Sequence, residues 1–378
     1  MKSLIHRLGV LLAAGWWFCS SDFVTAASAA GLRLVEQRKA EAAKKEMVYL
    51  TKEELLDGAR KEGRVVVHPG MDETSIPDLI SAFKKRYPFL KEVVGARITG
   101  IPAAQREVLE MVSGQARVDS FSPHSTHWSE YAKHKLILRY DLKTMVADGQ
   151  FKVPADMIDD SGVMVWTATN QGAIAYNAKV TPEALSKGWE SCLDPARAGK
   201  FAVDTKPNVL AWLVPAWGEE RVLNYARKLK SNKPIWNRGT TSALIKLAAG
   251  EYEFICGAYA HTAQRLLKKD PTLAIKLMIP DPFPVTFNDP NAIYTKAQSP
   301  HAGLLWMEFL ASNEAQDIMD ALDPGIGSFL VEGTVSSKWV RGRNVSLCGS
   351  GCRDKEEKFM QRIAVEAWEL PRVGATAK

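Results

Sequence analysis

Polar side chains collect in the loops that follow the expected strands of this sequence. In an open parallel sheet, such loops lie at the carboxyl edge, where helix N-termini direct backbone N–H groups at a ligand. The candidate binding residues in these loops are Asp72, Glu73, Thr74, Thr99, Ser122, His124, Ser125, Thr205, Lys206, Tyr259 and His261. Each Ser or Thr can equally serve as a helix cap. Because hydroxyls recur at the same place in the alternation, we predict a shared cleft for a polar or anionic ligand.

Two cations strengthen the prediction of an anionic ligand. Lys206 and Arg238 could each pair with a carboxylate or phosphate, Arg238 as a bidentate fork. Both residues can equally be solvated surface charges. Four tryptophans are interpreted as core residues that could also line the cleft, namely Trp128, Trp166, Trp212 and Trp236.

Alternating apolar runs indicate the elements that must position these residues. Strands are predicted at 64–68, 93–98, 118–121, 163–169, 172–177, 200–204 and 252–256. Amphipathic helices separate them, for example at 76–87, where Pro88 ends the pattern. This alternation predicts an α/β fold with a largely parallel sheet.

Length and composition limit the class of protein. The chain has 378 residues, of which 46% are hydrophobic and 24% charged. These values exclude a disordered, collagen-like or wholly membrane-embedded protein. The formal net charge of +6 is spread along the chain without a basic block, so no nucleic-acid partner is expected.

The N-terminus has the pattern of a secretory signal peptide. A basic start is followed by an uncharged run from Leu8 to Phe18 and by small residues up to Ala30. We predict a cleaved signal peptide at 1–29 and a charged leader at 30–51. An uncleaved membrane anchor is the alternative, although the run is short for a bilayer span. The mature protein is therefore expected in the periplasm.

Four cysteines remain after removal of the signal peptide. Cys348 and Cys352 could close a short disulfide loop in an oxidising compartment, or both could be free thiols. Cys256 lies in an apolar run and is interpreted as a small buried hydrophobe.

Several segments together resemble one known family. They are Glu62–Val67 followed by Ile76–Pro88, then Gly172–Asn177, Trp189–Asp204 and Ser299–Gln316. In order and spacing they resemble the type 2 periplasmic solute-binding proteins of ABC importers, in the branch of the ferric-iron, thiamine and polyamine binders. The resemblance covers about residues 52 to 335.

This resemblance implies a fold and a mechanism. Two α/β lobes, each a mostly parallel sheet flanked by helices, would close on a ligand by hinge motion. Lobe 1 is expected at 52–165 plus 288–337, lobe 2 at 166–287 and a C-terminal extension at 338–378. The chain would cross between lobes at Thr167–Asn170 and Phe283–Asn288, and Asn170 joins the candidate site.

The ligand can be an organic anion or a ferric ion. Ferric-binding members of this family commonly use two adjacent tyrosines, whereas here Tyr259 is followed by Ala260. The sequence therefore favours an organic or anionic solute, with no cofactor. Fe(III) is the alternative, bound by Tyr259 and His261 with help from Asp72, Glu73 or His124 of lobe 1.

Other classes fit the sequence less well. Ser122, His124 and Ser125 could suggest a hydrolase, but no Gly-x-Ser-x-Gly, Walker or His-Glu-x-x-His motif occurs. A periplasmic sensor or chemoreceptor partner would use the same closing cleft. We expect a monomeric binding protein, without enzymatic activity, that delivers a small molecule or ion to an ABC permease in the inner membrane.

Overall fold

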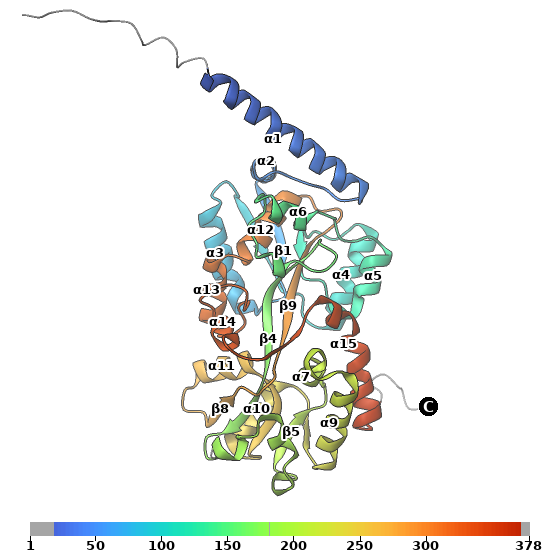
Figure 1. The fold of residues 1–378 in the computed structure, drawn as a ribbon, viewed down its shortest axis with the longest axis vertical. Coiled ribbons are helices and arrows are strands. Elements are labelled where there is room, and N and C mark those ends of the chain that lie inside the picture. Colours follow the sequence, from blue (N-terminus) through green and yellow to red (C-terminus); the bar gives the residue numbers. More distant parts are fainter. Residues whose placement is uncertain (1–18, 181, 372–378) are drawn as a thin grey trace, which may run out of the picture.

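Two long antiparallel strands form the spine of the molecule, which is described here by a computed structural model for residues 19–180 and 182–371. They are β4 (Val165–Asn177) and β9 (Phe283–Ile293), and they run side by side through both halves (Figure 1). Nearly every residue in both is buried, as expected for strands covered on both faces. We call the half that contains residue 64 lobe 1, and the other half lobe 2.

Lobe 1 contains a mixed sheet in the order β2–β1–β3–β9–β4. The strands β1 (Arg64–His68), β2 (Glu92–Gly95) and β3 (Ser120–Phe121) are parallel to one another, and β3 is antiparallel to β9. The helices of this lobe are α2 (Lys52–Glu62), α3 (Ile76–Arg86), α4 (Ile101–Ser113), α5 (Trp128–Lys133), α6 (Leu142–Ala147), α12 (Pro300–Leu310), α13 (Asn313–Leu322) and α14 (Val335–Val340).

Local sequence explains where these helices begin and how they pack. A reciprocal capping box between Thr51 and Glu54 starts α2. Phe83 of α3 contacts Trp306 edge-on at 5.1 Å between ring centroids, and both rings are fully buried. Aromatic pairs of this kind anchor the lobe 1 core.

Lobe 2 continues the sheet on the other side of β4. Its order is β4–β7–β5–β6, with β7 (Phe254–Tyr259) antiparallel to β4, and β5 (Phe201–Asp204) parallel to both β7 and β6 (Ile235–Asn237). Strand β8 (Ile275–Met278) also pairs with β4. The helices are α7 (Asn208–Ala211), α8 (Val214–Trp217), α9 (Glu219–Ser231), α10 (Thr240–Ala249) and α11 (Ala260–Lys269).

The C-terminal region packs on lobe 2. Strand β10 (Val345–Cys348) pairs with the lobe 2 end of β9, and α15 (Ser350–Arg362) follows, continued by a π-helical turn at Ile363–Ala367. Its buried apolar residues share one core cluster with Trp212 and Leu223 of lobe 2. Figure 1 shows α15 beside α9, with its first turn near the crossing strands.

Polar side chains fix the lobe 1 ends of the crossing strands. The carboxylate of Asp289 is buried and accepts hydrogen bonds from the Gly70 amide at 2.7 Å and the Thr167 hydroxyl at 3.1 Å. A side chain at Gly70 would collide with that carboxylate, so glycine is needed there. Gln316 of α13 also donates to the carbonyl of Thr167, at 2.8 Å.

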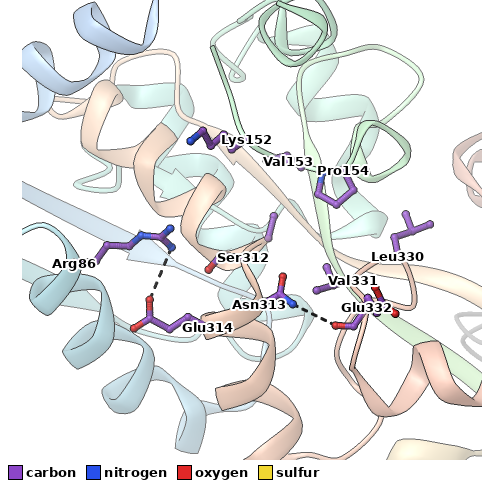
Figure 2. A pocket seen from close by; sticks show the side chains of 11 residues that line it. Arg86, Lys152, Val153, Pro154, Ser312, Asn313, Glu314, Leu330, Val331 and Glu332 are labelled. Atoms are coloured by element: carbon purple, nitrogen blue, oxygen red, sulfur yellow. Dashed lines mark hydrogen bonds and ion pairs between the residues drawn. The ribbon is translucent and has the colours of Figure 1, made fainter. Parts of the chain in front are cut away.

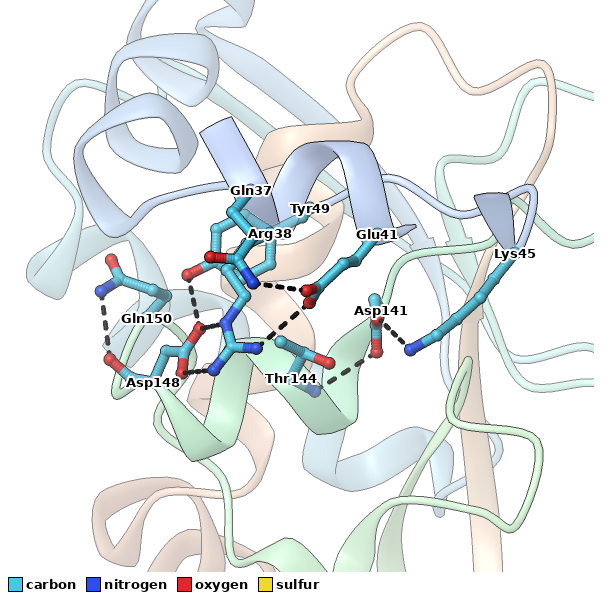
Figure 3. A network of polar contacts seen from close by, with 9 residues as sticks. All are labelled: Gln37, Arg38, Glu41, Lys45, Tyr49, Asp141, Thr144, Asp148 and Gln150. Carbon is cyan, nitrogen blue, oxygen red and sulfur yellow. Dashed lines mark hydrogen bonds and ion pairs between the residues drawn. The ribbon is translucent and has the colours of Figure 1, made fainter. Parts of the chain in front are cut away.

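Helix α1 (Cys19–Lys44) projects from lobe 1 and docks on it through its C-terminal half (Figures 1 and 3). Arg38 forms two hydrogen bonds with Asp148, at 2.8 and 3.1 Å, and Lys45 pairs with Asp141 at 3.1 Å. Most of the predicted signal peptide lies outside the described residues, and its last part, 19–29, is helical here. The predicted leader is helical up to Lys44. No helix within the described ranges is long and apolar enough to cross a bilayer.

Two disulfides connect the four described cysteines outside α1. Cys348 is bonded to Cys352, so of the two alternatives left open by the sequence the disulfide is present and the free thiols are not. The second disulfide, between Cys256 and Cys192, was not predicted from the sequence. Cys256 is buried as expected, but β7 carries it under the segment at 188–193, where Cys192 is buried as well.

Candidate functional site

Tyr259 lies between two other aromatic rings at the junction of β7 and α11. Its ring stacks on Trp212 with a centroid distance of 5.4 Å and on His261 at 5.9 Å. Burial raises the pKa of the Tyr259 phenol, and the carboxylates of Glu356 and Asp204 raise it further. The phenol is therefore neutral at physiological pH and can act as a hydrogen-bond donor.

His261 is buried behind Tyr259. Neither ring nitrogen has a hydrogen-bond partner among the described residues. Burial and the nearby charge of Arg265 lower the pKa of His261 to about 3, so the imidazole is neutral. Its Nδ1 lies 3.7 Å from a carboxylate oxygen of Asp323, whose pKa is raised to about 6 mainly by burial.

Arg265 joins the two lobes. From α11 in lobe 2, its guanidinium contacts Asp72 at 3.3 Å and Asp323 at 3.1 Å, both in lobe 1. Burial tends to raise the pKa of Asp72, but hydrogen bonds from Thr74 and the charges of Arg265 and Arg97 hold it below its usual range. Asp72 is therefore ionised, and the lobes are held together at this point by ion pairs.

We expect Arg265→Gln to favour separation of the lobes. Charge-assisted hydrogen bonds contribute about 2 kcal/mol, so the ratio of separated to closed molecules should rise roughly thirtyfold. Small-angle X-ray scattering of the ligand-free protein should show a larger radius of gyration. Lys268→Gln, at an exposed position of the same helix, is the control. Equal radii for both variants would contradict a role of Arg265 in closure.

A second group of candidates surrounds β5. Asp204 accepts hydrogen bonds from the amides of Lys206 and Gly239, and the charges of Lys206 and Arg238 act on it. Burial lowers the pKa of His124 in lobe 1, and His127 and Lys206 lower it further. Lys206 of lobe 2 thus lies within electrostatic reach of the His124 imidazole in lobe 1.

Other candidates have local structural roles. Thr74 donates to Asp72 at 2.7 Å within one turn, and both Glu73 and Thr99 are exposed. The Ser122 hydroxyl interacts with the buried Asp289, and the Thr205 amide donates to the Asn237 carbonyl.

Two candidates from the sequence remain, Asn170 and Ser125. The Asn170 side-chain oxygen is buried on β4 without a partner in the described chain. The side chain of Ser125 lies outside the described residues. The sequence missed four side chains that contribute to the site or support it: Arg265, Asp323, Arg353 and Glu356.

The geometry of Ser122 and His124 differs from that of a nucleophile and its base. The His124 Nδ1 atom lies 2.8 Å from the Thr126 hydroxyl, while Ser122 interacts with Asp289. The described residues also contain no group of three or more His, Cys, Asp or Glu side chains placed to hold a metal.

An open pocket of about 610 Å³ lies on the flank of lobe 1 (Figure 2). Its walls include the ion pair between Arg86 and Glu314, at 3.9 Å, and the carbonyl of Glu332, which accepts from Asn313. All the residues that line it belong to lobe 1. A solute bound there would contact lobe 1 alone.

Comparison with known proteins identifies the family. The family model of bacterial extracellular solute-binding proteins matches residues 78–330, so the chain belongs to this family. The predicted resemblance is thereby confirmed. A comparison with curated protein sequences gives no match.

Solved structures confirm the two-lobed periplasmic-binding-protein fold. The IdiA (FutA) protein of Trichodesmium, in complex with iron and citrate, has a TM-score of 0.64 at 16% identity, covering 82% of this chain and all of that one. Iron-bound HitA from Pseudomonas aeruginosa has a TM-score of 0.62 at 14% identity, and the match covers 80% of this chain and 99% of HitA. Apo ferric ion-binding protein A of Pasteurella haemolytica has a TM-score of 0.64 at 15% identity. The match covers 81% of this chain and 98% of that protein.

Proposed function

We propose that this protein is exported to the periplasm, where it captures a small organic anion, most simply a carboxylate, between its lobes. It then delivers the solute to an ABC permease. The observation that carries the proposal is the surroundings of Tyr259. The neutral phenol stacks on two rings and lies within electrostatic reach of Asp204. The charges of Lys206 and Arg238 act on the same Asp204 carboxylate. Rings, hydroxyl donors and cations together suit an organic anion.

Ferric iron is the second candidate. It is favoured by the similarity to the iron-bound HitA and the ferric ion-binding protein A, and by the contact between the rings of Tyr259 and His261. Against it, the chain has one tyrosine where the ferric-binding pattern has two. A ferric chelate of a polycarboxylate would satisfy both sets of observations.

Tyr259→Phe should weaken binding of the solute about tenfold by removing one hydroxyl donor. The variant and the wild type, both without residues 1–29, are titrated calorimetrically with citrate, succinate, glutamate and glucose 6-phosphate. Tyr252→Phe is the matched control, because its hydroxyl donates to the carbonyl of Ala243 inside lobe 2.

The outcomes separate the two candidates. Binding of a carboxylate or sugar phosphate by the wild type, weakened in Tyr259→Phe alone, supports the anion proposal. A visible charge-transfer band with ferric nitrilotriacetate, without binding of any free anion, would support iron instead. Unchanged affinity in Tyr259→Phe would mean that the site lies elsewhere.

A further inference from the structure

The C-terminal region reaches the same site from outside both predicted lobes. Strand β10 runs parallel to β9, and the Thr286 hydroxyl donates to the Cys348 carbonyl at 2.9 Å. The buried hydroxyl of Ser346 donates to the Trp212 carbonyl at 2.7 Å. The disulfide between Cys348 and Cys352 then joins the end of β10 to the first turn of α15. The region is therefore fixed to a crossing strand and to the backbone of Trp212, whose ring stacks on Tyr259.

Glu356 of α15 holds Trp212 in place. Its side chain is only 5% exposed, and one carboxylate oxygen accepts from the Trp212 indole at 2.8 Å and from the Asn208 amide at 3.0 Å. Trp212 stacks almost parallel to Tyr259, with 10° between the ring planes. A buried carboxylate in the C-terminal helix thus orients the aromatic wall of the site.

Arg353, one turn earlier in α15, pairs with the other carboxylate oxygen of Glu356. Its guanidinium carbon lies 5.9 Å from the ring centroid of Trp166 on β4, and that indole donates to Ser350 at 3.2 Å. Its charge also acts on the Tyr259 phenol. Glu356 is its one ion-pair and hydrogen-bond partner in the described part of the chain, and the side chain is 19% exposed. A guanidinium has five N–H donors, so several remain for a ligand.

We infer that Arg353 binds a carboxylate of the solute, and that Glu356 is the residue that positions it. This inference rests on the proposed function and deepens it, because it names the cation that recognises the anion. A guanidinium beside Trp166 and within electrostatic reach of Tyr259 can form two parallel hydrogen bonds with a carboxylate, as a lysine cannot. The C-terminal region would then be part of the binding site.

The test uses citrate as the probe and calorimetry at several NaCl concentrations. Arg353→Gln should weaken binding at least tenfold and should lower the dependence of Kd on salt, because one charge is lost. Arg353→Lys should recover the salt dependence and only part of the affinity. Arg362→Gln is the control on the same helix, since Arg362 pairs with surface residues such as Glu219.

A double-mutant cycle tests the positioning role. Glu356→Gln keeps an oxygen acceptor for Trp212 but loses the charge that holds Arg353. As a single substitution it should weaken citrate binding. Combined with Arg353→Gln, it should cause little further loss of affinity. Thermal melting of each ligand-free variant monitors folding.

Each outcome bears on the inference. Full citrate affinity in Arg353→Gln, with weak binding in Tyr259→Phe, would overturn the inference and leave the proposed function intact. Equal salt dependence in wild type and Arg353→Gln would also overturn it, because a purely structural role leaves that slope unchanged. If the wild type binds none of the carboxylates of the panel, both the inference and the carboxylate proposal fail.

Discussion

Replacing both Cys192 and Cys256 by alanine should lower the free energy of unfolding by about 4 kcal/mol. The disulfide spans 64 residues of sequence and removes that loop-closure entropy from the unfolded chain. Both residues are buried in lobe 2, in the core cluster that also contains Trp189 and Tyr225. The measurement is urea unfolding of the oxidised wild type and the double variant, followed by tryptophan fluorescence.

The second disulfide supplies the control. Cys348 and Cys352 are four residues apart, so the same argument gives only about 2 kcal/mol for their double alanine variant. The larger loss should thus come from the pair in lobe 2. If the two double variants lost equal stability, chain entropy would not be the main contribution of these bonds.

His261→Phe should remove a source of acid instability. In the folded chain the pKa of His261 is about 3, against 6.5 for a free imidazole. Between these values the unfolded chain binds a proton that the folded chain does not, so stability falls as pH decreases. The cost is about 1.4 kcal/mol per pH unit, or roughly 3 kcal/mol from pH 6.5 to 4.5. Between pH 6.5 and 4.5, the free energy of unfolding of His261→Phe should rise by that amount relative to wild type. Urea unfolding at each pH measures this difference.

Asp323→Asn should change stability in the opposite direction. The pKa of Asp323 is raised to about 6, so the folded chain takes up a proton before the unfolded chain does. This carboxyl contributes stability that is present below pH 3.8 and is lost as pH rises toward 6. Relative to wild type, Asp323→Asn should therefore lose stability as the solution is acidified. If the free energy of unfolding depended on pH in the same way in wild type, His261→Phe and Asp323→Asn, the burial of His261 and Asp323 would be contradicted.

Much of the fold could be predicted because apolar periodicity is a local property. The strand predicted at 64–68 coincides with β1, and the helix predicted at 76–87 corresponds to α3. The runs at 163–169 and 172–177 belong to one continuous strand, β4. Asn170 and Gln171 interrupt the apolar pattern there because they lie where the strand passes between lobes.

The site could be predicted only in part, because its components come from different layers. Loops after strands revealed Tyr259, His261 and Lys206. By contrast, Arg265 lies in the middle of a helix and Asp323 at the end of another, where charged residues usually face solvent. Only the packing of α11 against lobe 1 gives them a shared role. Similarly, four cysteines allow three pairings, and only the tertiary structure decides among them.

The fixed ends of β4 and β9 also determine where the molecule can bend. Above the junction, Asp289 and Gln316 attach the strands to lobe 1. Below it, β7 pairs with β4 from Gly172 onward and β10 pairs with β9 up to Thr286. Asn170 and Gln171 on β4 belong to neither attachment, and nor do Phe287 and Asn288 on β9, which pair with Thr169 and Ala168. We therefore expect any rotation of one lobe against the other to be concentrated in this short stretch of the two strands.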